Sequence, residues 1–302
     1  VWKPEVVLPF HPNGMLFEGL KGDEVVDSWT IYSVGGGALA NEASRLETPR
    51  SIYPLSTISE IKEWCYHEGK TFWEYVSDCE GPEIWDYLDT VWETMCATIQ
   101  RGLNNDGVLP GGLKVARKAS TYWVKSKSYT DSLSSRAKIY AYALATSEEN
   151  ASGGTVVTAP TCGSSGVMPA VLYHLSTSRN FLRIRILRAL ATAGLFGNVA
   201  KTNSSISGAE VGCQGEVGVA CAMAAAAACQ LFGGTPSQIE YAAEMGLEHH
   251  LGLTCDPVCG LVQVPCIERN AIAAARAFDA NAYATLSDGS HMVSFDKVVE
   301  VM

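Results

Sequence analysis

Positive charge is scarce in this sequence. Its 302 residues include 22 lysines and arginines against 32 aspartates and glutamates, which gives a formal net charge of −10 at pH 7. Proteins that bind nucleic acids or anionic membrane surfaces place a basic stripe against the phosphates. The acidic balance therefore argues against nucleic acid and against a membrane surface as the main partner.

Signals for secretion and for membrane insertion are also missing. The first residues, VWKPEVVLPF, lack the charged segment and the apolar core of a signal peptide. The longest apolar run, Val217 to Gly234, consists mostly of alanine and glycine and is interrupted by Gln230. Because alanine and glycine transfer weakly into lipid, we expect a buried core helix here rather than a transmembrane one. Together these features predict a cytoplasmic protein.

The ten cysteines lack the spacings of the common cysteine frameworks. They are too sparse for a disulfide scaffold, and in a reducing cytosol thiols are free, metal-bound or catalytic. There is no CxxC pair, which a structural zinc site usually contains, and no CxxCxxC run of a ferredoxin-type carrier. Half of them lie in segments predicted to be helical and are expected to be packing residues: Cys65, Cys79, Cys96, Cys221 and Cys229.

The other five cysteines lie in polar, glycine-containing loops. These are Cys162, Cys213, Cys255, Cys259 and Cys266. Their spacing alone leaves two alternatives open, ordinary buried thiols or an iron–sulfur site assembled from separate loops.

The first 45 residues differ from the rest of the chain. The segments EVVLPF, GMLFEGL and EVVDSWTIYSV are apolar and β-branched and are separated by turn residues, a pattern that predicts short strands. From Thr57 onward the pattern is helical. Its signals are a capping box at Thr57 and Glu60, a helix start at Thr235 and Pro236, and an apolar stripe at Leu88, Trp92, Met95 and Ile99. The sequence predicts a mainly α protein, with an all-helical domain over residues 46–302.

Three loops of small polar residues interrupt the helices. They span Thr158 to Ala170, Lys201 to Glu216, and Gly246 to Asn270. Their glycines allow backbone N–H groups to point inward, and the hydroxyls of the first two can bind a carboxylate. Three such loops in one helical domain predict a site where helix ends converge.

The motifs in these loops resemble those of a known family. The segments TAPTCGSSGVMPAVL, NSSISGAEVGCQGEVGVACAMAAA and EHHLGLTCDPVCGLVQVPCIERNAIAA are similar to the iron–sulfur-dependent L-serine dehydratases of bacteria. The likeness extends through LPFHPNGM, YSVGGG and EENASGGTVVTAPT and so covers essentially the whole chain. It implies that residues 1–45 are the end of an α/β domain and that residues 46–302 are the catalytic, cluster-binding α domain.

The resemblance also implies a cofactor and its ligands. The family holds a [4Fe–4S] cluster on three cysteines, which match Cys213, Cys255 and Cys266 here. Cys259 falls at a position that holds a small residue, and Cys162 falls at a variable one, so neither is expected as a ligand. Glu210 and Glu216, which flank Cys213, are candidates for hydrogen bonding near the cluster.

Two family features are not found in this chain. Family members begin with a further stretch of α/β domain, which includes a histidine implicated in catalysis, and end with a tail whose cysteine binds the fourth iron. We therefore expect a fragment, or a subunit that pairs with a β-domain chain, with the general base outside these residues. A homodimer is the other expected assembly.

The implied reaction is the elimination of water from L-serine, which yields pyruvate and ammonia. Hydroxide is a poor leaving group, and an iron with an open position can bind the serine hydroxyl as a Lewis acid. Three thiolates leave one iron without a protein ligand, so a three-cysteine site suits a lyase better than an electron carrier.

Substrate contacts are expected from the first two loops. The candidates are Thr161, Ser164, Ser165, Gly166, Asn203, Ser204 and Ser205, although helix capping is an alternative role for them. Lys201 and His249 are candidates for acid–base catalysis. For His249, a simple hydrogen bond at a helix end is the commoner role.

Two other functions remain open at this point. A cysteine desulfidase-type lyase on the same scaffold would eliminate sulfide instead of water. A non-catalytic helical module would use the loops for a structural metal or for a partner.

Overall fold

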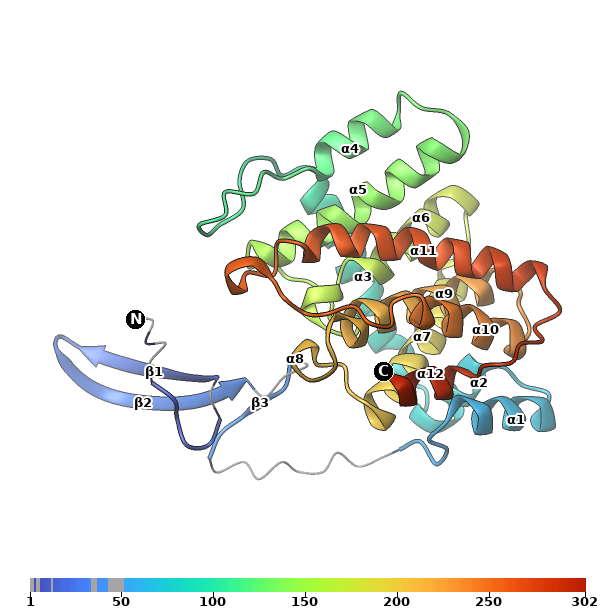
Figure 1. Ribbon diagram of the computed structural model, residues 1–302, viewed down its shortest axis with the longest axis horizontal. Helices are drawn as coiled ribbons and strands as arrows, with labels where there is room; N and C mark the ends of the chain where they lie inside the picture. Colours follow the sequence, from blue (N-terminus) through green and yellow to red (C-terminus); the bar gives the residue numbers. More distant parts are fainter. Residues whose placement is uncertain (1–2, 4–5, 12, 34–36, 43–51) are drawn as a thin grey trace. The chain divides into compact units, whose positions relative to one another are not determined.

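The computed structural model describes residues 3, 6–11, 13–33, 37–42 and 52–302 (Figure 1). The chain divides into two compact units, residues 1–51 and 52–302. The boundary predicted between residues 45 and 46 lies outside the described residues.

The first unit contains a small antiparallel sheet in the order β1-β2-β3, with β1 at Gly14–Lys21, β2 at Glu24–Ser33 and β3 at Leu39–Ala40. Gly22 lies in the two-residue turn between the first two strands with a φ of 67°, which glycine adopts without steric cost. The strands predicted after residue 13 are confirmed. The strand predicted for EVVLPF is wrong over residues 6–10, where Pro9 has no N–H to donate to a ladder.

The second unit is helical, which confirms the mainly α prediction. Its α-helices are α1 (Ile58–Glu68), α2 (Phe72–Glu80), α3 (Ile84–Leu103), α4 (Ala119–Ser126), α5 (Asp131–Ala151), α6 (Val167–Arg179), α7 (Arg183–Asn203), α8 (Gly208–Val211), α9 (Val219–Leu231), α10 (Pro236–Glu248), α11 (Cys266–Leu286) and α12 (Phe295–Val301). Short 3₁₀ turns occupy Cys162–Ser164 and Val258–Gly260, and a π-helical turn occupies Gln214–Gly218.

Local sequence signals account for several helix boundaries. Thr57 begins α1 and Thr235 begins α10, each with a complete capping box, and Pro236 stands in the first turn of α10. The predicted stripe of α3 is buried on one face. The first polar loop is shorter than predicted, because α6 begins at Val167 and includes Pro169 and Ala170.

Helix α9 lies at the centre of this unit. It packs against α6, α7, α10 and α11, which surround it in Figure 1. Every residue of α9 except Gln230 is buried, as expected for an alanine-rich core helix. The small side chains allow close packing: a Cβ on Gly246 of α10 would lie 3.0 Å from the backbone of Ala222.

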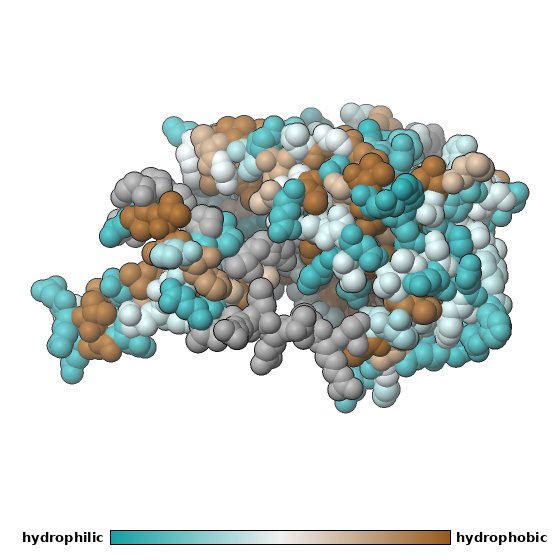
Figure 2. Space-filling model, turned by 60° about the horizontal axis from the view of Figure 1, so that its bottom comes forward, coloured by the Kyte–Doolittle hydropathy of each residue, from teal (hydrophilic) through white to brown (hydrophobic). Residues whose placement is uncertain are grey.

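Hydrophilic side chains cover much of the helical unit on the face that Figure 2 shows. Hydrophobic residues on that face are interspersed among them. Across the described residues, no helix combines the length and the apolar character needed to cross a membrane.

Replacing Gly102 by alanine tests the packing of α3 against α5. A Cβ at this position would lie 2.3 Å from the backbone oxygen of Ala145. Because backbone cannot move as a side chain end can, we expect Gly102→Ala to lower the free energy of unfolding by about 1–3 kcal/mol in urea denaturation. Gly194→Ala is the matched control, since it lies within α7 with nothing inside 4 Å of the added Cβ. Equal stability of the two variants would contradict this packing.

Candidate functional site

The thiols of Cys213, Cys255 and Cys266 lie near one another. Cys213 precedes the π-helical turn, Cys255 lies in the loop after α10, and Cys266 is the first residue of α11. Burial and the neighbouring thiols of Cys213 and Cys255 raise the pKa of Cys266 to about 11. Three separate segments therefore bring their thiols within electrostatic range of one another.

The carboxylate of Glu216, at the end of the second polar loop, contacts both the first and the third polar loop. Its Oε1 accepts a hydrogen bond of 2.8 Å from the Thr161 hydroxyl, and its Oε2 lies 3.8 Å from the Cys255 sulfur. Two glycines give it room, because a Cβ on Gly208 would lie 2.6 Å from Oε2 and one on Gly163 would lie 3.4 Å from Oε1. Glu216 itself lies in the π-helical turn, an irregularity often found at functional sites.

Asn270 fastens the first loop to α11. Its buried side chain donates to the carbonyls of Gly163 at 2.8 Å and Cys266 at 2.9 Å, and its Oδ1 accepts from the Gly166 N–H at 2.9 Å. The sequence did not predict a role for Asn270. Its position four residues after Cys266 is the available signal, because residues four apart share one helix face.

Most hydroxyls predicted to bind substrate in the first loop take part in internal hydrogen bonds. Thr161 and Ser164 are buried and form a reciprocal cap, with their oxygens 3.2 Å apart. Ser165 is also buried, and its hydroxyl has no hydrogen-bond partner within the described residues. Among these three, Ser165 has the hydroxyl that remains available to a ligand.

The residues predicted from the second loop have other surroundings. Asn203 is exposed and donates to the Ser56 carbonyl at 2.8 Å. Ser205 donates to Glu210 and accepts from the Ser207 N–H at 3.0 Å, while Ser204 is the half-buried C-cap of α7. Helix-end contacts thus account for Asn203 and Ser205, and substrate roles for these residues stay predictions.

The two acid–base candidates are both exposed. Lys201 lies in the last turn of α7, and His249 donates through Nδ1 to the Met245 carbonyl at 2.9 Å. The adjacent His250 is buried, and burial lowers its pKa to about 4. At neutral pH, His250 is therefore uncharged.

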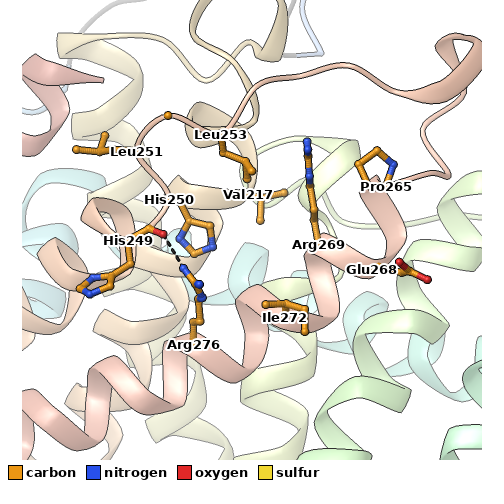
Figure 3. A pocket seen from close by; sticks show the side chains of 11 residues that line it. Val217, His249, His250, Leu251, Leu253, Pro265, Glu268, Arg269, Ile272 and Arg276 are labelled. Atoms are coloured by element: carbon orange, nitrogen blue, oxygen red, sulfur yellow. Dashed lines mark hydrogen bonds between the residues drawn. The ribbon is translucent and has the colours of Figure 1, made fainter.

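A cavity of about 430 Å³ is lined by residues from the π-helical turn, from the loop after α10 and from α11 (Figure 3). Val217 and Pro265, which line it, are close in sequence to Cys213 and Cys266. Arg269 and Arg276 of α11 line the cavity, and so does His250, which lies in the segment after α10. The cavity combines apolar walls with two cations, an environment suited to a small carboxylate.

The thiols do not form a site for one metal ion. Across the described ranges, no group of three or more histidine, cysteine, aspartate or glutamate side chains is arranged to hold an ion. An iron–sulfur cluster requires a wider arrangement of thiols than one metal ion does, because each cysteine binds a separate iron of a larger core. Three converging thiols with an arginine nearby are a donor set that fits such a core.

Removing the Thr161 hydroxyl tests the contact with Glu216. We expect Thr161→Val to lower the free energy of unfolding by about 1–2 kcal/mol, because a carboxylate loses a donor that the similar-sized valine cannot supply. Thr161→Ser keeps the donor and should restore most of that loss. Urea denaturation followed by circular dichroism measures both, and a valine variant as stable as the unmodified chain would contradict the role of this bond.

The chain is similar to known proteins over nearly its whole length. Residues 35–302 match the family model described as "Serine dehydratase alpha chain". The chain is 46% identical to L-serine dehydratase 1 of Escherichia coli and 45% identical to L-serine dehydratase of Streptomyces coelicolor, in each case over 98% of this chain and 68% of the relative. It is 37% identical to L-serine dehydratase of Helicobacter pylori over 97% of this chain. The chain therefore belongs to the serine dehydratase alpha chain family.

Proposed function

We propose that this chain catalyses the elimination of water from L-serine, with pyruvate and ammonia as the final products. The observation that carries this proposal is that the thiols of Cys213, Cys255 and Cys266 lie near one another, in a chain whose relatives are named L-serine dehydratases. Loss of the α-proton and of hydroxide gives aminoacrylate. Its tautomer then takes up water and releases ammonia, so the overall reaction converts serine to pyruvate and ammonia.

The proposed cofactor is a [4Fe–4S] cluster, held by Cys213, Cys255 and Cys266. When bound, it would supply a Lewis-acidic iron for the serine hydroxyl. The thiols are otherwise unfavourable places for negative charge, since burial is the largest cause that raises the pKa of each of them. Cluster binding therefore requires the release of thiol protons.

The chain's own residues would bind and orient the substrate. The guanidinium groups at the cavity would attract a carboxylate. His250, uncharged at neutral pH, can accept a proton or a hydrogen bond through its Nε2 atom, because its Nδ1 is engaged with the Gly246 carbonyl at 2.7 Å.

The relatives distinguish between the functions that the sequence left open. Their names specify L-serine, and this favours elimination of water over elimination of sulfide from cysteine. A catalytic role is likewise favoured over a purely structural module. The expected setting is the cytoplasm, in an assembly that is either a homodimer or a pair with a β-domain chain.

Alanine substitution of the proposed ligands tests the cofactor. After anaerobic purification, we expect the unmodified chain to contain iron and sulfide and to absorb broadly in the visible range. Cys213→Ala, Cys255→Ala and Cys266→Ala should each abolish that absorption. Cys259→Ala is the matched control, because Cys259 is exposed in the same loop and is not a proposed ligand.

Pyruvate release from L-serine is measured on the same samples. We expect activity in the unmodified chain and in Cys259→Ala, and its loss in the other three variants. A colourless or zinc-containing chain after anaerobic reconstitution with iron and sulfide would contradict the proposed cofactor. A chain that holds the cluster but releases no pyruvate would contradict the proposed reaction.

A further inference from the structure

We propose that Arg269 is a positioning residue that holds the three cysteines of the site in one arrangement. This inference rests on the proposed cluster site and assigns a role to a residue that is not itself a ligand. Three links of Arg269 support it, one to the segment of each cysteine.

The first link is through helix α11. Arg269 lies three residues after Cys266, close to one helical turn, so its side chain and the cysteine share a helix face. Asn270 secures the same turn by its hydrogen bond to the Cys266 carbonyl. The base of the Arg269 side chain is thus fixed relative to Cys266.

The second link is to the two residues on either side of Cys255. The Nη1 atom of Arg269 donates to the Thr254 carbonyl at 2.7 Å, and Nη2 lies 3.5 Å from the Asp256 carboxylate. These two partners immediately precede and follow Cys255. Both contacts are made by the planar fork of the guanidinium, which a lysine ammonium lacks.

The third link reaches Cys213. The Arg269 guanidinium also interacts with the side chain of Cys213. The positive charge of Arg269 acts on all three thiols in the same sense, against the negative charge of Glu216. Hydrogen bonds and charges near cluster sulfurs tune both the affinity and the potential of such centres.

A second arginine on the same helix makes none of these three contacts. Arg276 lies seven residues further along α11 and lines the same cavity. Its Nη1 donates instead to the His249 carbonyl at 2.6 Å (Figure 3). Arg276 therefore provides a matched control, because it has the same charge as Arg269, lies on the same helix and lines the same cavity.

The test compares Arg269→Met, Arg269→Lys and Arg276→Met with the unmodified full-length chain, all reconstituted anaerobically with iron and sulfide. Iron per chain, the visible spectrum and the rate of absorbance loss in air are measured. We expect Arg269→Met to bind iron about 10–100-fold more weakly and to bleach faster, as changes next to metal ligands do. Arg269→Lys should recover part of the loss, and Arg276→Met should match the unmodified chain in iron affinity, visible spectrum and bleaching rate.

Kinetics with L-serine provide a second readout. Where Arg269→Met retains cluster, kcat per cluster should fall more than KM rises, because the misplaced ligands affect the reacting centre. Circular dichroism establishes that the variants are folded. If Arg269→Met does not fold, Arg269→Lys is tested by the same criteria, with an iron affinity below that of the unmodified chain as the expected result.

Two different results would separate the two proposals. An unmodified chain that takes up no iron overturns the cofactor assignment, and the role of Arg269 with it. An unmodified chain that takes up iron, with Arg269→Met and Arg269→Lys equal to it in iron affinity and in bleaching rate, overturns the role of Arg269 alone.

Discussion

The arrangement of this site depends on the partly buried carboxylate of Glu216. Its two oxygens face different segments, with Thr161 on one side and Cys255 on the other. A charged carboxylate in such a position needs donors around it, and the first polar loop supplies one. Glycine at positions 163 and 208 leaves room for this carboxylate, since side chains there would occupy the space that it fills.

The alanine-rich core explains how the loops reach this point. The π-helical turn that bears Glu216 leads directly into α9, and small side chains along α9 allow neighbouring helices to approach closely. The starts of α6, α9 and α11 are thereby brought to one region of the helical unit. Close helix packing and the meeting of the loops are two consequences of the same small residues.

Features encoded over a few residues were predictable from sequence. The capping boxes at Thr57 and Thr235, the stripe of α3 and the buried α9 each depend on neighbours within a turn or two. Contacts between distant segments were not, because no local pattern specifies which loops will meet. The link from Asn270 to Gly163 spans 107 residues, and the link from Arg269 to Thr254 depends on the path of an irregular loop. The family motifs identified the three cysteines, but they did not indicate which polar neighbours would hold them.

The electrostatics of the site favour a cationic occupant. Burial disfavours the thiolate form of each of the three cysteines, and Glu216 adds to this cost. Arg269 supplies one positive charge against three prospective thiolates and one carboxylate, so the described side chains leave an excess of negative charge when all three thiols ionise. Because charges in partly buried sites must be compensated, three thiolates become favourable only when further positive charge enters. An iron–sulfur core, the proposed cofactor, would provide such charge, so the three thiols would ionise when it binds rather than before.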